Sequence, residues 1–385
     1  MTTATVMITG TRAPAALDLA RSFAAAGWRV IGADRPLWPV SRLSRAFAAH
    51  YRLPPPRAAH HAFAERLADL IGLERVDLLV PTCEEAFFMA RHRARLDGLC
   101  RVACPDFATM RRLHDKAALP EMAGGLGVEV PETLRVTDQA DLRAALARLG
   151  EAVVLKPAFS RFASRTLIRP SARQAADLRP SPAEPWACQR FVAGDEICTY
   201  AVACQGRLTA FAAYRPRHRV GQGAGILFEP VEAAQPQAFA AAFARRHQLD
   251  GQFAFDLIRA ADGRWFVIEC NPRATSGVHL FRGGAALAEA FMGKDVGGAA
   301  PARPGMVGLA MALVGLPRAL AAGRLGTALA DWRRAEDAVA RPGDRGPALS
   351  QWLALVEGLA NAARHGCSPL AATTADIEWN GEDLA

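Results

Sequence analysis

Three oxygen-bearing side chains stand close together in one predicted β-hairpin, and their chemistry suits a divalent cation. Asp256 precedes an Asp262-Gly263 pair that is typical of a hairpin turn, and Glu269 and Asn271 follow it. Because side chains alternate across a strand, all three are predicted to leave the same face of the hairpin. Two carboxylates and an amide oxygen, completed by phosphate oxygens, suit Mg²⁺ or Mn²⁺. We favour this site over a solvated hairpin face with unrelated charges.

The expected register places Ala261 and Asp262 at the tip of the hairpin. Asp256 then lies opposite Val267, and Glu269 becomes its diagonal neighbour, at roughly 7–8 Å between Cα atoms. Apolar side chains are predicted to fill the opposite face: Phe253, Phe255, Leu257, Phe266 and Ile268.

Lysine is rare in this chain, and two lysines stand where an anion could meet them. Of the 46 basic residues, 43 are arginines and only Lys116, Lys156 and Lys294 are lysines. Lys156 ends an apolar strand predicted at Glu151–Pro157, where a partly desolvated ammonium is costly unless an anion meets it. Lys116 stands at the head of a helical segment. Their rarity indicates positions where a compact ammonium is needed and a planar guanidinium is not suitable.

The composition excludes several classes of protein. A length of 385 residues suits two or three packed units. The formal net charge of +8 comes from arginines scattered along the chain, so it indicates no nucleic-acid partner. The eight cysteines include no Cys-x-x-Cys pair and are predicted to be reduced. The longest apolar run, residues 305–316, is too short to cross a bilayer, and no leader segment is visible, so we expect a cytoplasmic protein without stable membrane insertion.

The first third of the chain alternates predicted strands (Thr5–Thr9, Trp28–Ala33 and Asp77–Pro81) with helices such as Ala15–Ala26. This alternation indicates a Rossmann-like parallel sheet with crossover helices. The turn after the first strand lacks the Gly-x-Gly-x-x-Gly spacing, although Asp34 lies where a ribose-binding acid would stand. An NAD(P)-dependent oxidoreductase is therefore a less favoured alternative.

The segment after the strand Asp77–Pro81 could also contact a ligand, because ligands bind at the carboxyl ends of parallel strands. Thr82 and Glu85 fit a helix capping box, which explains the segment without catalysis. Substrate contact by Glu84 is the less favoured alternative.

The middle of the chain is predicted to be α+β, and the region from residue 301 to be Ala- and Leu-rich helix. Arg215, Arg217 and Arg219 fall in residues 215–225, which are predicted to form a mobile loop that clamps carboxylates or phosphates. A solvated basic loop is an equally good interpretation. Ser276 and His279 directly follow the hairpin and are candidates for substrate contact.

Taken in order, these segments resemble the ATP-grasp superfamily, whose members include biotin carboxylase, carbamoyl phosphate synthetase and D-alanine–D-alanine ligase. The resemblance covers roughly residues 1–300. Its motifs are Asp115-Lys116, Leu155-Lys156-Pro157, Gln189 to Val192 with Glu196, Phe255-Asp256, and Ile268 to Arg273. No single motif is specific, but their common order is.

The resemblance implies that ATP lies between two α+β subdomains, behind an N-terminal α/β domain. Lys116 and Lys156 would contact its phosphates, and Asp256, Glu269 and Asn271 would hold Mg²⁺. Arg273 would stabilise a developing acyl phosphate. These roles agree with the needs of phosphoryl transfer, which depends on positioning and charge neutralisation.

The resemblance also implies an adenine end, where backbone groups near Phe191 and Val192 would read the base and Glu196 the ribose hydroxyls. Gln189 stands where an acid is common, and its amide oxygen could accept from the adenine amino group. A second departure is the segment 158–165, which contains no glycine where such families carry a Gly-rich phosphate loop. Ser160, Ser164 and the two arginines of the segment, Arg161 and Arg165, could still bind phosphate there.

The sequence thus predicts α/β and α+β architecture in four parts. These are an N-terminal α/β domain (1–105), two ATP-grasp subdomains (106–188 and 189–300) and a helical C-terminal region (301–385), which could also form a homodimer contact. The predicted function is an ATP-dependent ligase that activates a carboxylate as an acyl phosphate for attack by an amine. A thiol acceptor, a phosphotransfer outcome and a non-catalytic ATP-binding protein are the alternatives.

Overall fold

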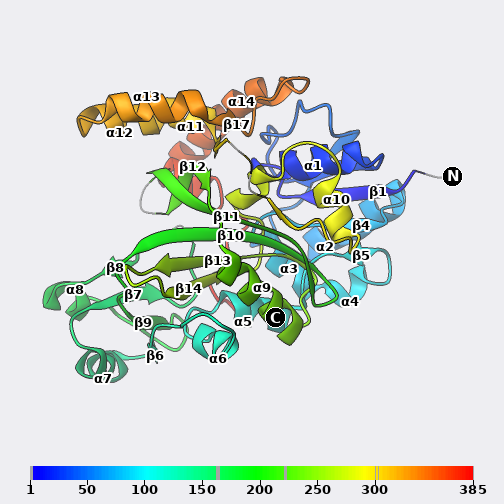
Figure 1. Cartoon of the computed structure of the whole chain (residues 1–385). Helices are drawn as coiled ribbons and strands as arrows, with labels where there is room; N and C mark the ends of the chain where they lie inside the picture. Colours follow the sequence, from blue (N-terminus) through cyan, green and yellow to red (C-terminus); the bar gives the residue numbers. More distant parts are fainter. Residues whose placement is uncertain (1–2, 162–164, 221–222, 300, 302, 385) are drawn as a thin grey trace.

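The computed structural model of the chain describes residues 3–161, 165–220, 223–299, 301 and 303–384. Three β-sheets, of five, eight and four strands, organise these residues. Figure 1 shows the N-terminal sheet on one side, the largest sheet across the middle, and the four-stranded sheet beyond it, next to α7 and α8.

The N-terminal sheet is parallel throughout, with the strand order β3-β2-β1-β4-β5. Its alternating strands and helices confirm the Rossmann-like α/β prediction. Its elements are β1 (Thr5–Thr9), α1 (Ala15–Ala25), β2 (Arg29–Asp34), β3 (Ala49–Arg52), α2 (His60–Glu74), β4 (Leu78–Val80), α3 (Glu85–Arg91), α4 (Arg93–Leu96) and β5 (Arg101–Val102).

The four-stranded sheet is antiparallel, in the order β6-β9-β7-β8. Helix α7 packs on it, because its buried residues Leu142, Ala145 and Leu149 join the core formed by β7 and β9. The elements are α5 (Phe107–His114), α6 (Leu119–Ala123), β6 (Thr133–Val136), α7 (Gln139–Leu149), β7 (Val153–Pro157), β8 (Leu167–Ile168), α8 (Ala172–Ala176) and β9 (Trp186–Arg190).

The largest sheet carries the predicted metal hairpin at one edge, in the order β14-β13-β10-β11-β12-β16-β17, with β15 paired to β11. Helix α9 covers one face through Phe239 and Phe243, which pack on Phe255. The elements are β10 (Asp195–Cys204), β11 (Arg207–Val220), β12 (Ala224–Pro230), α9 (Ala234–Arg246), β13 (Gly251–Arg259), β14 (Trp265–Asn271), β15 (Gly298–Ala299), β16 (Gly305–Met306) and β17 (Glu336–Asp337).

The C-terminal region is mostly helical, as predicted, but β16 and β17 within it extend the largest sheet. After α14 the chain returns to the N-terminal sheet, where Trp379 is buried. A 3-10 helix (Ser276–Leu280) and α10 (Ala286–Phe291) precede this region. Its own helices are α11 (Gly308–Ala310), a π-helix (Met311–Gly315), α12 (Leu316–Ala321), α13 (Leu325–Arg334), α14 (Gly346–His365) and α15 (Pro369–Ala372).

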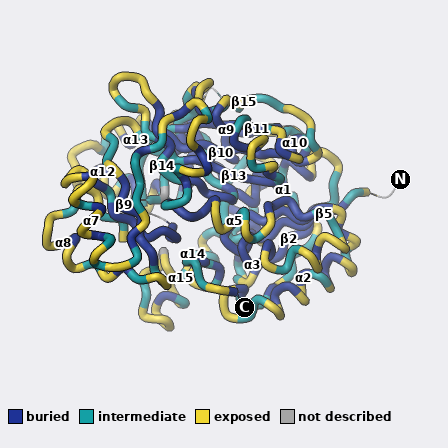
Figure 2. The backbone as a smooth tube through the Cα atoms, turned by 90° about the horizontal axis from the view of Figure 1, so that it is seen from below, coloured by how far each residue is buried: buried dark blue, intermediate teal, exposed yellow. Residues whose placement is uncertain are grey.

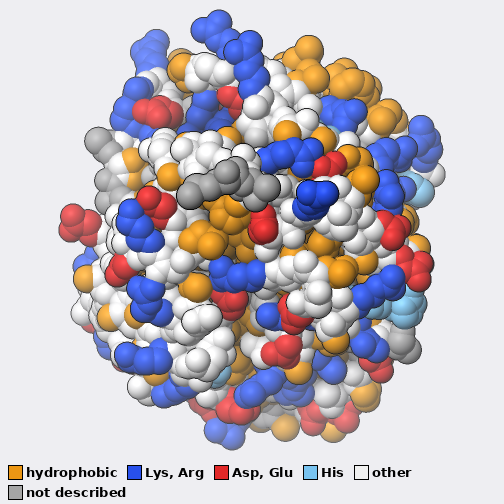
Figure 3. Space-filling model, turned by 90° about the vertical axis from the view of Figure 1, so that its right-hand side faces the viewer, with side chains coloured by type: hydrophobic (Ala, Val, Ile, Leu, Met, Phe, Trp, Pro, Cys, Tyr) orange, Lys and Arg blue, Asp and Glu red, His pale blue; other side chains and the backbone are white. Residues whose placement is uncertain are grey.

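Burial and charge are distributed as expected for a packed α/β protein. Figure 2 shows the central strands buried and the outer turns of α2, α7, α8 and α12 exposed. Figure 3 shows acidic and basic side chains interspersed over one face rather than gathered into a basic stripe. Among the described residues, no helix is both long and apolar enough to cross a membrane.

Candidate active site

The metal hairpin forms between β13 and β14, but its register differs from the prediction. Arg259 pairs with Trp265, and Gly263 occupies the turn with φ of +86°. The Ala260 N–H donates to the Arg264 carbonyl, so three residues form the tip of the hairpin. The prediction had a tip of two residues.

A bulge at Ile268 then brings Glu269 directly opposite Asp256, so the predicted diagonal arrangement is wrong. Val267 pairs with Leu257 and joins the core of the sheet. Ile268 lines the large cavity instead, which corrects the prediction that it fills the apolar face. The bulge moves the two carboxylates closer together than the predicted register does.

The three predicted metal-ligand side chains leave the same face of the hairpin and lie together. Asn271 Nδ2 lies 3.3 Å from Asp256 Oδ2, and Glu269 Oε1 lies 3.4 Å from Lys116 Nζ. Burial and the nearby carboxylates of Glu269 and Glu196 together raise the pKa of Asp256 to about 7. The carboxylates crowd one another where little water can screen them, which favours the protonated form of Asp256 in the absence of a cation.

Lys116 and Lys156 are both buried beside this cluster, while Lys294 is exposed and pairs with Glu289 at 2.9 Å. Lys116 Nζ donates to the carbonyl of Ser160 at 2.8 Å. Lys156 Nζ donates to the Ile268 carbonyl at 2.9 Å. Burial lowers the pKa of Lys156 to about 8, although the charge of Glu269 opposes this shift. Two of the three lysines thus lie beside the predicted metal ligands.

Arg273 extends the site toward the N-terminal sheet. Its Nη2 donates to Asn271 Oδ1 at 3.1 Å, and its Nε lies 3.6 Å from Oε1 of Glu84. Glu84 is fully buried and lies 3.5 Å from Nε of Arg161. Sequence reasoning favours a capping role for the segment that contains Glu84, and it considers Arg161 only as a possible phosphate ligand, not as a partner of Glu84. Only position in the sequence could have pointed to Glu84 and Arg161, because each lies shortly after the end of a strand: Glu84 after β4 and Arg161 after β7.

A cavity of about 760 Å³ joins these groups to an apolar region. That size lies within the range of small-molecule sites. Charged and polar residues line one end: Lys156, Asp256, Glu269, Asn271, Arg273 and Ser276. Mostly apolar residues line the other: Val154, Leu167, Ile168, Phe191, Val192 and Ile258.

The predicted adenine end is only partly free for a base. Phe191 and Val192 line the cavity, but the Phe191 N–H donates to the Ala152 carbonyl at 2.8 Å. Gln189 is buried, and its Oε1 accepts from Lys156 Nζ at 3.1 Å. Since an ammonium can only donate, this contact turns the amide oxygen toward the lysine. Gln189 therefore orients Lys156, which the sequence did not suggest.

The arginine segment is a strand and not the predicted mobile loop, because residues 215–220 continue β11 and pair with β12. Alternation places Arg215, Arg217 and Arg219 on one side. Arg215 lies 3.0 Å from Asp195, and Arg217 lies 3.5 Å from Asp331. Only Arg219 of the three lines the cavity, where its guanidinium lies 2.8 Å from the carboxylate of Glu196.

The remaining predicted residues are divided between the cavity and its surroundings. Ser276 lines the cavity. His279 is buried outside it, with Nδ1 2.7 Å from Oδ2 of Asp18. Ser160 lines a separate small cavity with Glu378. Ser164 lies outside the described residues.

The donor set fits a hard divalent cation. Asp256 and Glu269 face each other directly, and the Asn271 amide lies beside Asp256 with its oxygen accepting from Arg273. A hard cation suits this group, because it would relieve the repulsion between carboxylates that helps to raise the pKa of Asp256. Mg²⁺ and Mn²⁺ both prefer such oxygen ligands.

Comparison with known proteins identifies the fold. No protein-family model matches the chain, and no curated protein sequence matches it. The N5-carboxyaminoimidazole synthetase from Staphylococcus aureus complexed with ADP aligns with a TM-score of 0.61 at 14% identity, over 83% of this chain and 86% of that one. An L-amino acid ligase from Bacillus licheniformis aligns with a TM-score of 0.53 at 15% identity, over 72% and 68%.

The biotin carboxylase domain of Hydrogenobacter thermophilus 2-oxoglutarate carboxylase, in complex with MgADP and bicarbonate, aligns with a TM-score of 0.56 at 12% identity, over 72% of this chain and 65% of that one. All three structures have the ATP-grasp fold. The chain therefore has this fold too, and the resemblance stated from its motifs is confirmed. At identities this low, the likeness establishes the architecture alone.

Proposed function

We propose that this protein is an ATP-dependent ligase that activates a carboxylate as an acyl phosphate, which an amine then attacks. The observation that carries the proposal is the meeting of Asp256, Glu269 and Asn271 at the polar end of the large cavity. Two buried lysines and Arg273 surround them. ATP and Mg²⁺, or Mn²⁺, are the proposed ligands.

Each residue has a role that its surroundings support. Asp256, Glu269 and Asn271 would hold the metal ion, which neutralises phosphate charge when bound. Lys116 and Lys156 would bind phosphate oxygens. Because both ammonium groups are buried, little water would screen their electrostatic attraction to the phosphate. The apolar end of the cavity, beside Val192, would take the adenine, and Glu196 the ribose.

Arg273 would stabilise charge on the carboxylate as it accepts the phosphoryl group. Holding the carboxylate beside the terminal phosphate makes the transfer effectively intramolecular, which lowers the entropic part of the barrier. The amine then displaces phosphate from the acyl phosphate and forms the C–N bond. The named functions of the S. aureus, B. licheniformis and H. thermophilus proteins support a ligase with a small-molecule carboxylate substrate.

The test is ADP release by the purified chain, measured with panels of carboxylic acids and amines. Glu269→Ala and Lys156→Ala are expected to reduce turnover by at least about 100-fold, the size of losing one electrostatic contact to a transition state. The pair Glu289→Ala and Lys294→Ala serves as a matched control, since it removes the same residue types from an exposed ion pair. Unchanged turnover in both site variants would refute the assignment.

The same experiment separates the alternatives. Mass spectrometry of the product distinguishes a C–N bond from a thioester or a phosphorylated acceptor. A non-catalytic ATP-binding protein would be stabilised by ATP and would release no ADP with any substrate set. An NAD(P)-dependent enzyme is disfavoured because Asp34, its candidate ribose ligand, binds the guanidinium of Arg12 at 2.6 Å.

A further inference from the structure

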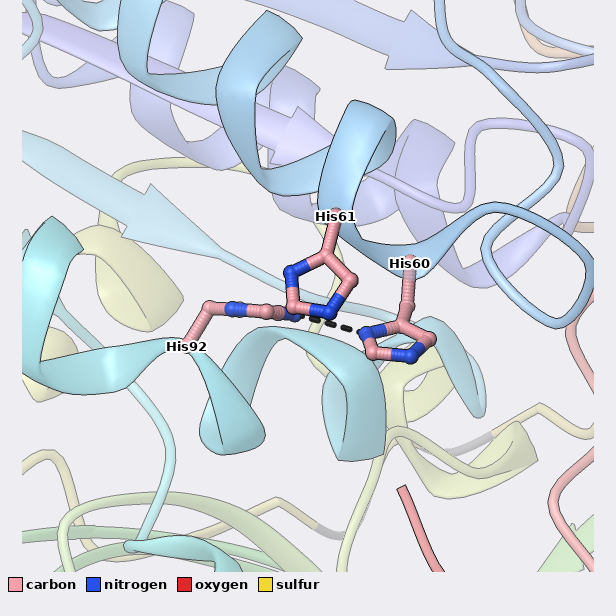
Figure 4. Close-up of side chains that lie close together, drawn as sticks. All are labelled: His60, His61 and His92. Carbon is pink, nitrogen blue, oxygen red and sulfur yellow. Dashed lines mark hydrogen bonds between the residues drawn. The ribbon is translucent and has the colours of Figure 1, made fainter. Parts of the chain in front are cut away.

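Three of the nine histidines gather on the outside of the N-terminal sheet, apart from the large cavity. His60 and His61 begin α2, and His92 lies between α3 and α4. Nitrogen atoms, one from each ring, all lie within 4.8 Å of one another. Figure 4 shows the three rings converging, with Nδ1 of His60 2.9 Å from Nε2 of His92.

We propose that His60, His61 and His92 form a binding site for a transition-metal ion, with Zn²⁺ as the preferred occupant. Imidazole nitrogens lie about 2.0–2.1 Å from Zn²⁺, which places the nitrogens of a tetrahedral site about 3.3 Å apart. The observed separations, from 2.9 Å to no more than 4.8 Å, bracket this value. Small side-chain rotations therefore suffice to close the site.

The surroundings of the three rings meet the other needs of a metal ligand. An imidazole binds metal only when neutral, and burial lowers the pKa of His92 to about 4 and also lowers that of His60. Positive charge on His61, and then on Arg91, also lowers both pKa values. His61 is exposed, so an ion can enter from solvent and water can complete the fourth position.

The donor type separates this site from the one in the large cavity. Three nitrogens suit Zn²⁺, Ni²⁺ or Cu²⁺, whereas Mg²⁺ prefers oxygen ligands. The carboxylates near the hairpin therefore suit the Mg²⁺ of the proposed nucleotide site, and the imidazoles suit a different ion. The two sites are expected to load independently.

Occupation would join two elements that are distant in sequence. His60 and His92 are separated by 32 residues, so one ion would tie the start of α2 to the end of α3. Helix α3 begins at Glu85, directly after the buried Glu84 beside Arg273. The proposed ion would therefore restrain the far end of a helix whose near end borders the candidate active site.

The experiment is a Zn²⁺ titration of the full chain carrying no polyhistidine tag, in excess Mg²⁺ and without ATP. Competition with a chromogenic chelator gives stoichiometry and affinity, and Co²⁺ substitution reports tetrahedral coordination through its visible spectrum. The expected result is one ion per chain, bound at least about ten-fold more weakly by His61→Gln and His92→Gln. The control is His365→Gln, which removes an exposed histidine at the end of α14.

His61 is exposed, so its replacement should leave the fold intact, and circular dichroism in EDTA checks this. Glu269→Ala should retain the ion, which separates this site from the proposed nucleotide metal. Equal Zn²⁺ affinity in wild type, His61→Gln and His92→Gln would overturn the proposal, as would the absence of Zn²⁺ binding.

Discussion

A carboxylate that water does not reach needs positive charge nearby, and Glu84 lies between Arg161 and Arg273 for this reason. Glu84→Gln keeps the shape and removes the charge, leaving both guanidinium groups without this carboxylate. We expect the free energy of unfolding to fall by about 3 kcal/mol, as for other broken buried ion pairs. Urea unfolding measures the change.

The matched control for that change is Glu121→Gln, an exposed acid that contacts Arg112 at 3.0 Å. Exposed ion pairs contribute little, so this variant should unfold like the wild type. If Glu84→Gln were equally harmless, the charge balance inferred for this region would be incorrect. ADP release by a folded Glu84→Gln protein then reports whether Glu84 also orients Arg273.

Candidate site residues stand out in the sequence where chemistry makes their type rare or costly. Lys116 and Lys156 stood out because almost every other basic residue is arginine, and the structure buries both. Arg161 was a candidate only through its place in the glycine-free segment 158–165, since one arginine among 43 carries no signal by its type. Its importance follows from a contact with Glu84, 77 positions earlier in the chain, which only folding creates.

At the scale of elements, alternation predicted the shared face of the metal hairpin but not its register. A three-residue turn and the bulge at Ile268 each shift the pairing by one position, and neither leaves a clear trace in one sequence. The strand at Arg215 was missed for a related reason. The basic and glycine-rich composition of residues 215–225 is typical of a loop. Pairing of β11 with β12 nevertheless holds Arg215 and the residues after it in a strand.

Two glycine substitutions should have opposite effects on stability. Gly263 has φ of +86° with no atom near a new Cβ, so Gly263→Ala is expected to destabilise by about 1 kcal/mol through backbone strain alone. Gly358 lies inside α14, where a Cβ would meet only Thr373 at an ordinary 3.9 Å. Gly358→Ala should stabilise by about 1 kcal/mol. Thermal unfolding of both variants checks the signs, and equal signs would contradict the assigned turn.

At the scale of the whole molecule, the order of strands and helices predicted the N-terminal α/β sheet, and the resemblance carried by the ordered motifs implied the ATP-grasp architecture. The proposed limits at residues 105, 188 and 300 stay predictions. The path of the C-terminal segment was not predictable, since a short polar stretch carries no periodicity. In the structure Asp376 binds Arg12 at 2.6 Å, and the Trp379 N–H lies 3.3 Å from Glu84.

Trp379 is expected to stabilise the entire protein. It is fully buried, with ring centroids 4.8 Å from Phe87 and 5.1 Å from Phe159. Trp379→Ala should lower the free energy of unfolding by about 3–5 kcal/mol, because removing the indole loses buried apolar contacts and leaves a void in the core. Trp352→Ala, which removes a tryptophan that is half exposed on α14, should have a much smaller effect. Unfolding of the two variants in guanidinium chloride shows whether the C-terminal segment around Trp379 stabilises the whole protein.

That returning segment has a consequence for how the protein folds. Arg12 and Asp376 are 364 residues apart, and Trp379 packs on Phe87 of α3. Contacts between residues so far apart in sequence close long loops, which makes their formation slow. We therefore expect the N-terminal sheet to reach its final packing only when residues 376–379 dock on it.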